Sequence, residues 1–228
     1  MKLGIILTPD TRSKAYLQKI LHNKINLSNI IFMNDNRPEK MYTKEEKNES
    51  LKNGFDISES VFTTLQNSKI QYQMFDFVDI NNEKLIHHIC SLELDFIIYT
   101  GGGILKHSIL NSGPKFVHMH PGITPNYRGS TCFYYSIINE NNCGVTAFVM
   151  DEGIDTGPVI YQKKFKKPDH KFIDEIYDAD IRSETLIDIL QNCLLEKSFE
   201  KSDKQGNTYF IIHPVLKHIA ILSCLEKK

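Results

Sequence analysis

The sequence predicts an α/β protein in which a mostly parallel sheet carries helices on both faces. Short apolar runs alternate along the chain with longer segments that have helical periodicity. The 228 residues suffice for one domain of this kind with a sizeable core. The composition, with 41% apolar and 24% charged residues, is ordinary for a globular protein.

The elements follow in order along the chain. Strands are expected at residues 2–7, 29–33, 70–75, 95–99 and 115–120, then within 144–150 and 155–166, with a last one at the start of the tail 208–222. Helical spacing occurs at 11–24, 81–92 and 173–190 and in the rest of that tail. We place one domain at 1–200 and a short strand–helix extension at 201–228. The charge-rich stretch 36–54 lacks an apolar face and is predicted to be an exposed loop or mobile excursion, which could include a helical turn.

Charge and cysteine content exclude several classes. Lys plus Arg (27) nearly balances Asp plus Glu (28), which disfavours a nucleic-acid or acidic-membrane partner. The five cysteines include no C-x-x-C pair, so we expect reduced thiols, no disulfide framework and no thiolate zinc site. No apolar run reaches membrane-spanning length, and the first one is followed by no cleavage site. These features predict a cytoplasmic protein.

Three glycines, Gly101, Gly102 and Gly103, directly follow the strand predicted at 95–99. Without side chains, they let a ligand approach backbone N–H and C=O groups. Their spacing fits neither the dinucleotide-binding nor the P-loop pattern. The alternative is a tight turn that happens to be rich in glycine.

Two histidines and a group of carboxylates are the candidate chemical groups. His118 and His120 face the same side of a strand, and Asp151, Glu152 and Asp155 lie in a glycine-containing loop after another strand. The histidines could be metal ligands, acid–base groups or merely hydrogen-bonded structural residues. The carboxylates could orient an imidazole, take a proton or bind a cation, or they could form an acidic turn.

The order of the motifs is more specific than any one of them. His-Pro-Gly, Pro-x-Tyr-Arg-Gly, Gly-Val-Thr and Met-Asp-Glu-Gly-x-Asp-Thr-Gly follow one another within 95–162. This series resembles the folate-dependent formyltransferases, which act on methionyl-tRNA, glycinamide ribonucleotide or nucleotide-linked amino sugars. The resemblance implies a Rossmann-like sheet and 10-formyltetrahydrofolate as the formyl-donor cosubstrate.

The same resemblance assigns the site. His120 and Asp155 fall on the family's catalytic pair, and His118 occupies the position of the family's asparagine. Asp155 would hold His120 and help carry a proton, His120 would donate to the developing oxyanion, and His118 would replace an amide donor with one whose charge depends on pH. The implied folate contacts are Gly101, Gly102, Gly103, Ile104, Leu105, Met150, Asp151, Gly153 and Ile154.

The acceptor is expected to be a primary amine of a small molecule, and we favour an amino sugar on a nucleotide. The balanced charge and the short stretch after the motifs disfavour tRNA. Formyltetrahydrofolate hydrolysis and formylation of methionyl-tRNA or glycinamide ribonucleotide stay open as alternatives. So do a metal-dependent enzyme built on the histidines and carboxylates, and a non-catalytic binding protein. The sequence leaves the oligomeric state open, a dimer included.

Overall fold

The computed structural model describes residues 1–199, 201 and 206–225. The chain forms two compact units, Met1–His118 and Met119–Lys228. The predicted boundary at residue 200 falls outside the described residues, and it stays a prediction.

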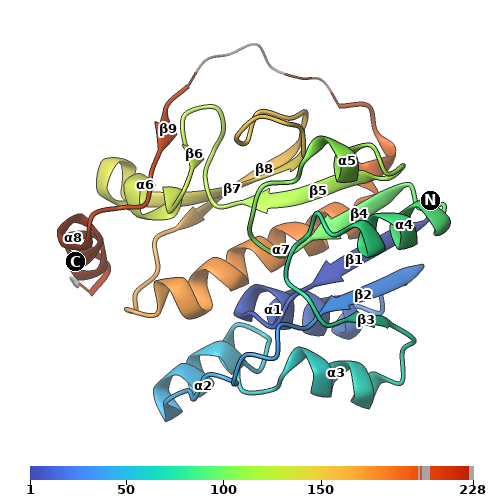
Figure 1. The fold of residues 1–228 in the computed structure, drawn as a ribbon. Helices are drawn as coiled ribbons and strands as arrows, with labels where there is room; N and C mark the ends of the chain where they lie inside the picture. The colour runs from blue at the N-terminus through green and yellow to red at the C-terminus, as the bar shows by residue number, and fades with distance from the viewer. Residues whose placement is uncertain (200, 202–205, 226–228) are drawn as a thin grey trace. The chain divides into compact units, whose positions relative to one another are not determined.

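The first unit is a parallel sheet with helices between its strands (Figure 1). Its strands run in the order β3-β2-β1-β4-β5, and every recorded pairing among them is parallel. Its elements are β1 (Leu3–Leu7), α1 (Thr11–His22), β2 (Asn29–Met33), α2 (Lys44–Lys52), α3 (Val61–Ser68), β3 (Gln73–Phe75), α4 (Glu83–Ser91), β4 (Phe96–Tyr99), α5 (His107–Leu110) and β5 (Lys115–His120), of which Met119 and His120 belong to the second unit.

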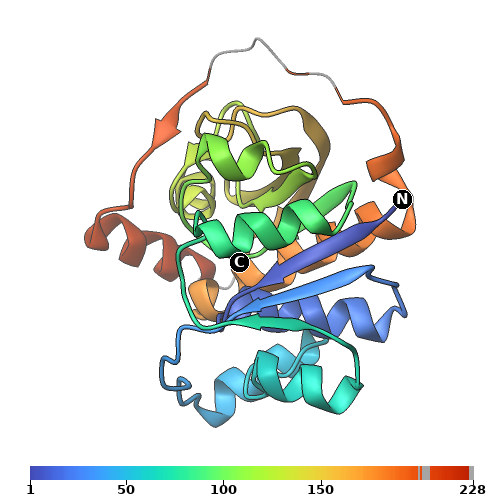
Figure 2. The ribbon, with the colours of Figure 1, turned by 45° about the vertical axis from the view of Figure 1, so that its right-hand side comes forward.

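The middle of this sheet is buried on both faces. Ile5 of β1 pairs with Ile30 of β2 and Ile98 of β4, and none of the three side chains is more than 1% exposed. Such continuous apolar strands are typical of parallel sheets covered on both sides. α1 leads from β1 to β2, whereas α4 leads from β3 to β4 on the other side of β1. Because crossovers are right-handed, these two helices cover opposite faces (Figure 2).

The prediction of a loop at 36–54 is wrong over about half of that stretch, because α2 occupies nine of its residues. The cause is a capping box. The Glu46 N–H donates to Thr43 Oγ1 at 3.2 Å, and the Thr43 N–H donates to Glu46 Oε2 at 2.7 Å. Glu45 and Glu46 also place negative charge in the first turn, which favours the helix dipole. The helix is therefore favoured by the residues at its N-terminus rather than by an apolar face.

The second unit combines an antiparallel strand pair with helices. β7 pairs with β8 antiparallel, and β6 pairs with β9 parallel in a separate two-stranded sheet. Its elements are β6 (Arg128–Gly129), α6 (Cys132–Glu140), β7 (Asn142–Val149), β8 (Val159–Lys166), a π-helix (Ile173–Tyr177), α7 (Asp178–Gln191), a 3₁₀ turn (Leu194–Glu196), β9 (Thr208–Tyr209) and α8 (Pro214–Leu225).

The predicted fold class is confirmed: the protein is α/β, Rossmann-like and mostly parallel. The strand and helix expected in the tail are β9 and α8. Among the described residues, every helix is too short or too polar to cross a lipid bilayer.

Candidate active site

The centre of the candidate site lies in the second unit, where a histidine meets an aspartate. His120 is the last residue of β5, and Asp155 lies in the loop between β7 and β8. Nδ1 of His120 is 3.2 Å from Oδ2 of Asp155. The side chains are 3% and 15% exposed, so both are largely removed from water. The fold thus brings together two groups that are far apart in the sequence.

The backbone of one short segment supplies the other partners of this pair. Nε2 of His120 donates to the Tyr127 carbonyl oxygen at 2.9 Å, and the Gly129 N–H donates to Oδ2 of Asp155 at 2.7 Å. Because a carbonyl oxygen only accepts, Nε2 carries a proton. Nδ1 is therefore the nitrogen at which His120 can gain or lose a proton, and it faces the carboxylate.

Burial lowers the pKa of His120, and the Arg182 guanidinium lowers it further. The Asp155 carboxylate and the hydrogen bond to Tyr127 act in the opposite direction without cancelling the effect of burial. Protonation of Nδ1 would place an imidazolium beside the Asp155 carboxylate, so burial and the carboxylate act on the same proton in opposite directions.

Arg182 is a charged neighbour of this pair that was not predicted from the sequence. It lies on α7, buried, where Nε donates to Oδ1 of Asp178 at 2.7 Å and Nη1 donates to the Met119 carbonyl at 3.0 Å. The available signal was an Asp and an Arg four residues apart in a helical segment, a spacing typical of an ion pair. Nothing in the sequence connected that pair to β5.

The loop that carries Asp155 is internally braced. Oδ1 of Asp151 accepts from the Gly153 N–H at 3.1 Å and from Thr156 Oγ1 at 2.8 Å, while Oδ2 forms an ion pair with Lys201 at 2.6 Å. Burial by itself would raise the pKa of Asp151, but these hydrogen bonds outweigh it and hold the pKa below its usual value. Asp155 has a φ of +52°, in the left-handed region. Of the predicted folate contacts in this loop, Met150 is half-buried, whereas Gly153 and Ile154 are exposed.

The glycine loop follows β4 in the first unit. Gly103 has a φ of +100°, and a Cβ at Gly101 would come within 2.7 Å of Tyr99 Oη. Both positions therefore require glycine or nearly so. Tyr99 Oη donates to the Gly102 carbonyl, and burial raises the pKa of Tyr99 to about 12. The loop next to these glycines has Ile104 exposed and Leu105 buried.

His118 lies in the first unit, half-buried, with Nδ1 3.2 Å from the Tyr99 carbonyl oxygen. Since the carbonyl accepts, Nδ1 carries the proton in this contact. Donation of a second hydrogen bond, from Nε2, requires the protonated ring. Among the described residues, no group of three or more His, Cys, Asp or Glu side chains is arranged to hold a metal ion.

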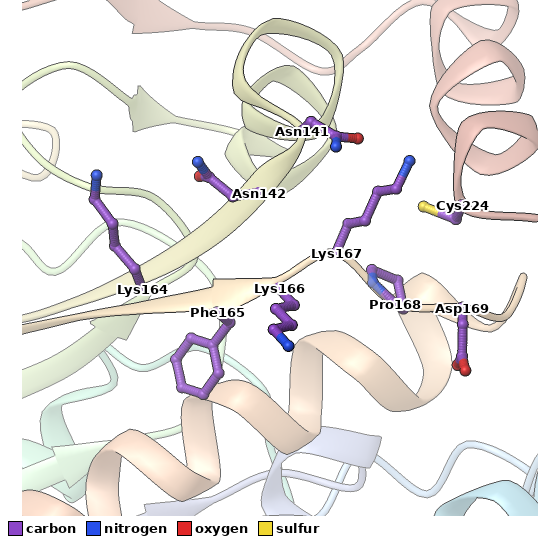
Figure 3. A pocket seen from close by; sticks show the side chains of 9 residues that line it. All are labelled: Asn141, Asn142, Lys164, Phe165, Lys166, Lys167, Pro168, Asp169 and Cys224. Atoms are coloured by element: carbon purple, nitrogen blue, oxygen red, sulfur yellow. The ribbon is translucent and has the colours of Figure 1, made fainter. Parts of the chain in front are cut away.

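A surface hollow of about 640 Å³ in the second unit is separate from the predicted site residues. It is lined by Asn141, Asn142, Lys164, Phe165, Lys166, Lys167, Pro168, Asp169 and Cys224. Figure 3 shows the three lysine side chains pointing in different directions, and Lys167 donates to the Ser223 carbonyl at 2.5 Å. Because the ammonium groups do not converge, this hollow is not a candidate active site.

The fold and the pair define an α/β protein with a largely buried histidine–aspartate contact. The family model described as "Formyl transferase" matches residues 10–185, and the chain belongs to that family. A methionyl-tRNA formyltransferase from Sulfurimonas denitrificans is 27% identical over 204 residues, which are 84% of this chain and 60% of that protein. The chain spans about half to three fifths of the length of the first curated relatives it matches.

Solved structures share the fold at lower identity. A sugar N-formyltransferase from Shewanella sp FDAARGOS_354 superposes with a TM-score of 0.61 at 17% identity, covering 99% of this chain and 88% of that one. An N-formyltransferase from Helicobacter canadensis, in complex with folinic acid and dTDP-3-aminofucose, gives a TM-score of 0.63 at 15% identity, covering 99% and 80%.

Proposed function

We propose that this chain transfers a formyl group from 10-formyltetrahydrofolate to a primary amine of a small molecule, an amino sugar linked to a nucleotide. The observation that carries the proposal is the contact between His120 Nδ1 and Asp155 Oδ2 at 3.2 Å. Membership of the formyl transferase family supplies the reaction type. Formyl transfer needs a group that accepts a proton from the attacking amine and returns one to the leaving nitrogen.

The chemistry follows from the bonds that change. The neutral amine nitrogen bonds to the formyl carbon, and the carbonyl electron pair moves onto oxygen. When the tetrahedral centre collapses, that pair re-forms the carbonyl and the bond from carbon to folate N10 breaks, with its electrons staying on N10. One proton leaves the amine and one reaches N10. In our proposal Asp155 accepts the first proton and shares it with Nδ1 of His120 before it is returned.

His118 is proposed to stabilise the oxyanion. Its Nδ1–H donates to the Tyr99 carbonyl, which orients the ring, and the protonated imidazole would donate to the oxyanion. The proposed folate contacts are the glycine loop (Gly101, Gly102, Gly103, Ile104 and Leu105) and the acidic loop (Met150, Asp151, Gly153 and Ile154). The bracing hydrogen bonds of Asp151 favour a backbone role for the acidic loop, in which Asp151 fixes its shape.

Two lines of support favour the amino-sugar acceptor. The solved N-formyltransferase from Helicobacter canadensis holds dTDP-3-aminofucose, and its fold matches 99% of this chain. The net charge of −1 does not favour an RNA acceptor. Methionyl-tRNA is the second candidate, because the curated sequence relatives carry that name.

The test is an acceptor screen with purified protein and 10-formyltetrahydrofolate. Its arms are nucleotide-linked amino sugars, methionyl-tRNA, glycinamide ribonucleotide and no acceptor, with mass-spectrometric detection of the formyl adduct. We expect an adduct with an amino sugar that forms much more slowly in His120→Ala and Asp155→Asn. Rapid release of formate without acceptor would replace the transferase with a hydrolase. Failure of every arm would refute the proposal.

A further inference from the structure

The two backbone groups that hold the catalytic pair belong to residues 127–129. The Tyr127 carbonyl accepts from His120 and the Gly129 N–H donates to Asp155. Any shift of this segment therefore changes the position of both side chains. The residues that hold 127–129 in place therefore contribute to the geometry of the site.

The stretch 206–209, which includes β9, holds this segment in place. The Arg128 N–H donates to the Asn207 carbonyl at 3.2 Å, and the Ser130 N–H donates to the Tyr209 carbonyl at 2.9 Å. Nη2 of Arg128 donates to the Gly206 carbonyl at 2.9 Å. These bonds form the parallel pair of β6 and β9, which lie side by side in Figure 1.

A parallel pair of two residues on each strand gives little stability by itself. Side chains supply the remainder. The ring of Tyr209 stacks on Tyr127 with centroids 5.4 Å apart and an interplanar angle of 18°. It also contacts Tyr135 of α6, with centroids 4.4 Å apart. Tyr209 thus joins the segment that holds the catalytic pair to a helix of the second unit.

The backbones approach closely at two glycines. A Cβ on Gly129, whose φ is +97°, would lie 2.1 Å from the Tyr209 carbonyl oxygen. A Cβ on Gly206 would lie 1.7 Å from the Pro125 carbonyl oxygen. Since neither position has room for a side chain, the register of the two segments is closely defined.

We propose that residues 206–209 position the His120–Asp155 pair for catalysis and that Tyr209 is the positioning residue. Its ring holds the Tyr127 carbonyl and the Gly129 N–H at their distances from the pair. The inference rests on the proposed function, because it assigns Tyr209 a role in the reaction of that pair. It adds an element far along the chain, outside the motifs that identify the family.

The test compares three variants with the wild-type chain. Tyr209→Ala removes both ring contacts. Tyr209→Phe retains the ring, and Phe210→Ala removes a neighbouring ring that is 80% exposed. We expect Tyr209→Ala to lower kcat roughly tenfold or more, because small misplacements of reacting groups are costly. The KM for folate should change less than about twofold, since the proposed folate contacts are untouched. Tyr209→Phe and Phe210→Ala should behave like the wild type.

The ¹H–¹⁵N signals of the His120 ring, assigned with His120→Ala, give a readout that needs no substrate. They should shift in Tyr209→Ala and stay in place in the other two variants. Unchanged ring signals and unchanged kcat in a folded Tyr209→Ala would overturn the inference. If that variant fails to fold by circular dichroism, Tyr209→Leu, which keeps apolar bulk without stacking, is held to the same expectation. If the wild type transfers no formyl group, the proposed function fails, and the ring signals still decide whether Tyr209 positions the pair.

Discussion

Replacing Asp155 with asparagine removes one negative charge and almost preserves the shape of the side chain. The amide oxygen can still accept from the Gly129 N–H, which lies 2.7 Å from Oδ2 in the native structure. The atom 3.2 Å from His120 Nδ1, however, can no longer take up a proton. A positioned acid–base group contributes roughly 10²–10⁴-fold to a rate, or about 3–5 kcal/mol of barrier. We therefore expect kcat to fall by about that factor.

The assay is single-turnover formyl transfer to the amine that the acceptor screen identifies. Glu152→Gln is the matched control, because it makes the same change of carboxylate to amide at an exposed position in the same loop. It should leave the rate within about twofold of the wild type, as surface substitutions usually do. A wild-type rate in Asp155→Asn, or an equal loss in Glu152→Gln, would refute the acid–base role.

Further substitutions test the structure around the site. Because the pKa of His120 is lowered in the folded state, the unfolded chain binds a proton at this residue first, near pH 6.5. The stability that depends on His120 should therefore be complete above that pH and should decrease as the pH falls toward the folded pKa. Urea midpoints measured against pH should show this decrease, and His120→Gln should flatten the curve. Gly129→Ala should destabilise by about 1–3 kcal/mol in urea unfolding, because of its positive φ and the backbone oxygen 2.1 Å from the added Cβ; an unchanged midpoint would argue against that close approach. Arg182→Leu leaves Asp178 buried without its partner and should cost about 3–5 kcal/mol by the same measurement, whereas a neutral result would mean that water reaches this pair. Thr43→Ala removes the capping box and should cost about 1 kcal/mol, while Thr43→Ser should be nearly silent.

The sequence was sufficient for the sheet and for the identity of the pair. Short runs rich in apolar residues, as at Asn29–Met33 and Lys115–His120, predicted strands at the residues where the structure has them. The spacing of the family motifs predicted that His120 and Asp155 would meet, and the structure places them in contact. Both results depend on side-chain pattern, which the sequence displays directly.

The sequence was not sufficient for elements that depend on the backbone. α2 forms on a capping box, and periodicity of apolar residues does not detect it. The Tyr127 carbonyl and the Gly129 N–H contact the pair through main-chain atoms, which any residue possesses. β9 pairs with β6 although the two are distant in the sequence, and they approach closely at Gly129. Because glycine has no side chain, the sequence does not indicate which segment packs against it.

The φ of +52° at Asp155 restricts which side chains this position tolerates. Asparagine, aspartate and glycine adopt the left-handed region with little strain, whereas branched or bulky residues do so only at a cost. Exchange of aspartate for asparagine is therefore close to neutral for the backbone and reports on charge alone. Alanine or glutamate at the same position would mix conformational strain into any measured loss of activity. Substitutions at Asp155 would thus distinguish two requirements at this position, one for a residue that tolerates a positive φ and one for a carboxylate.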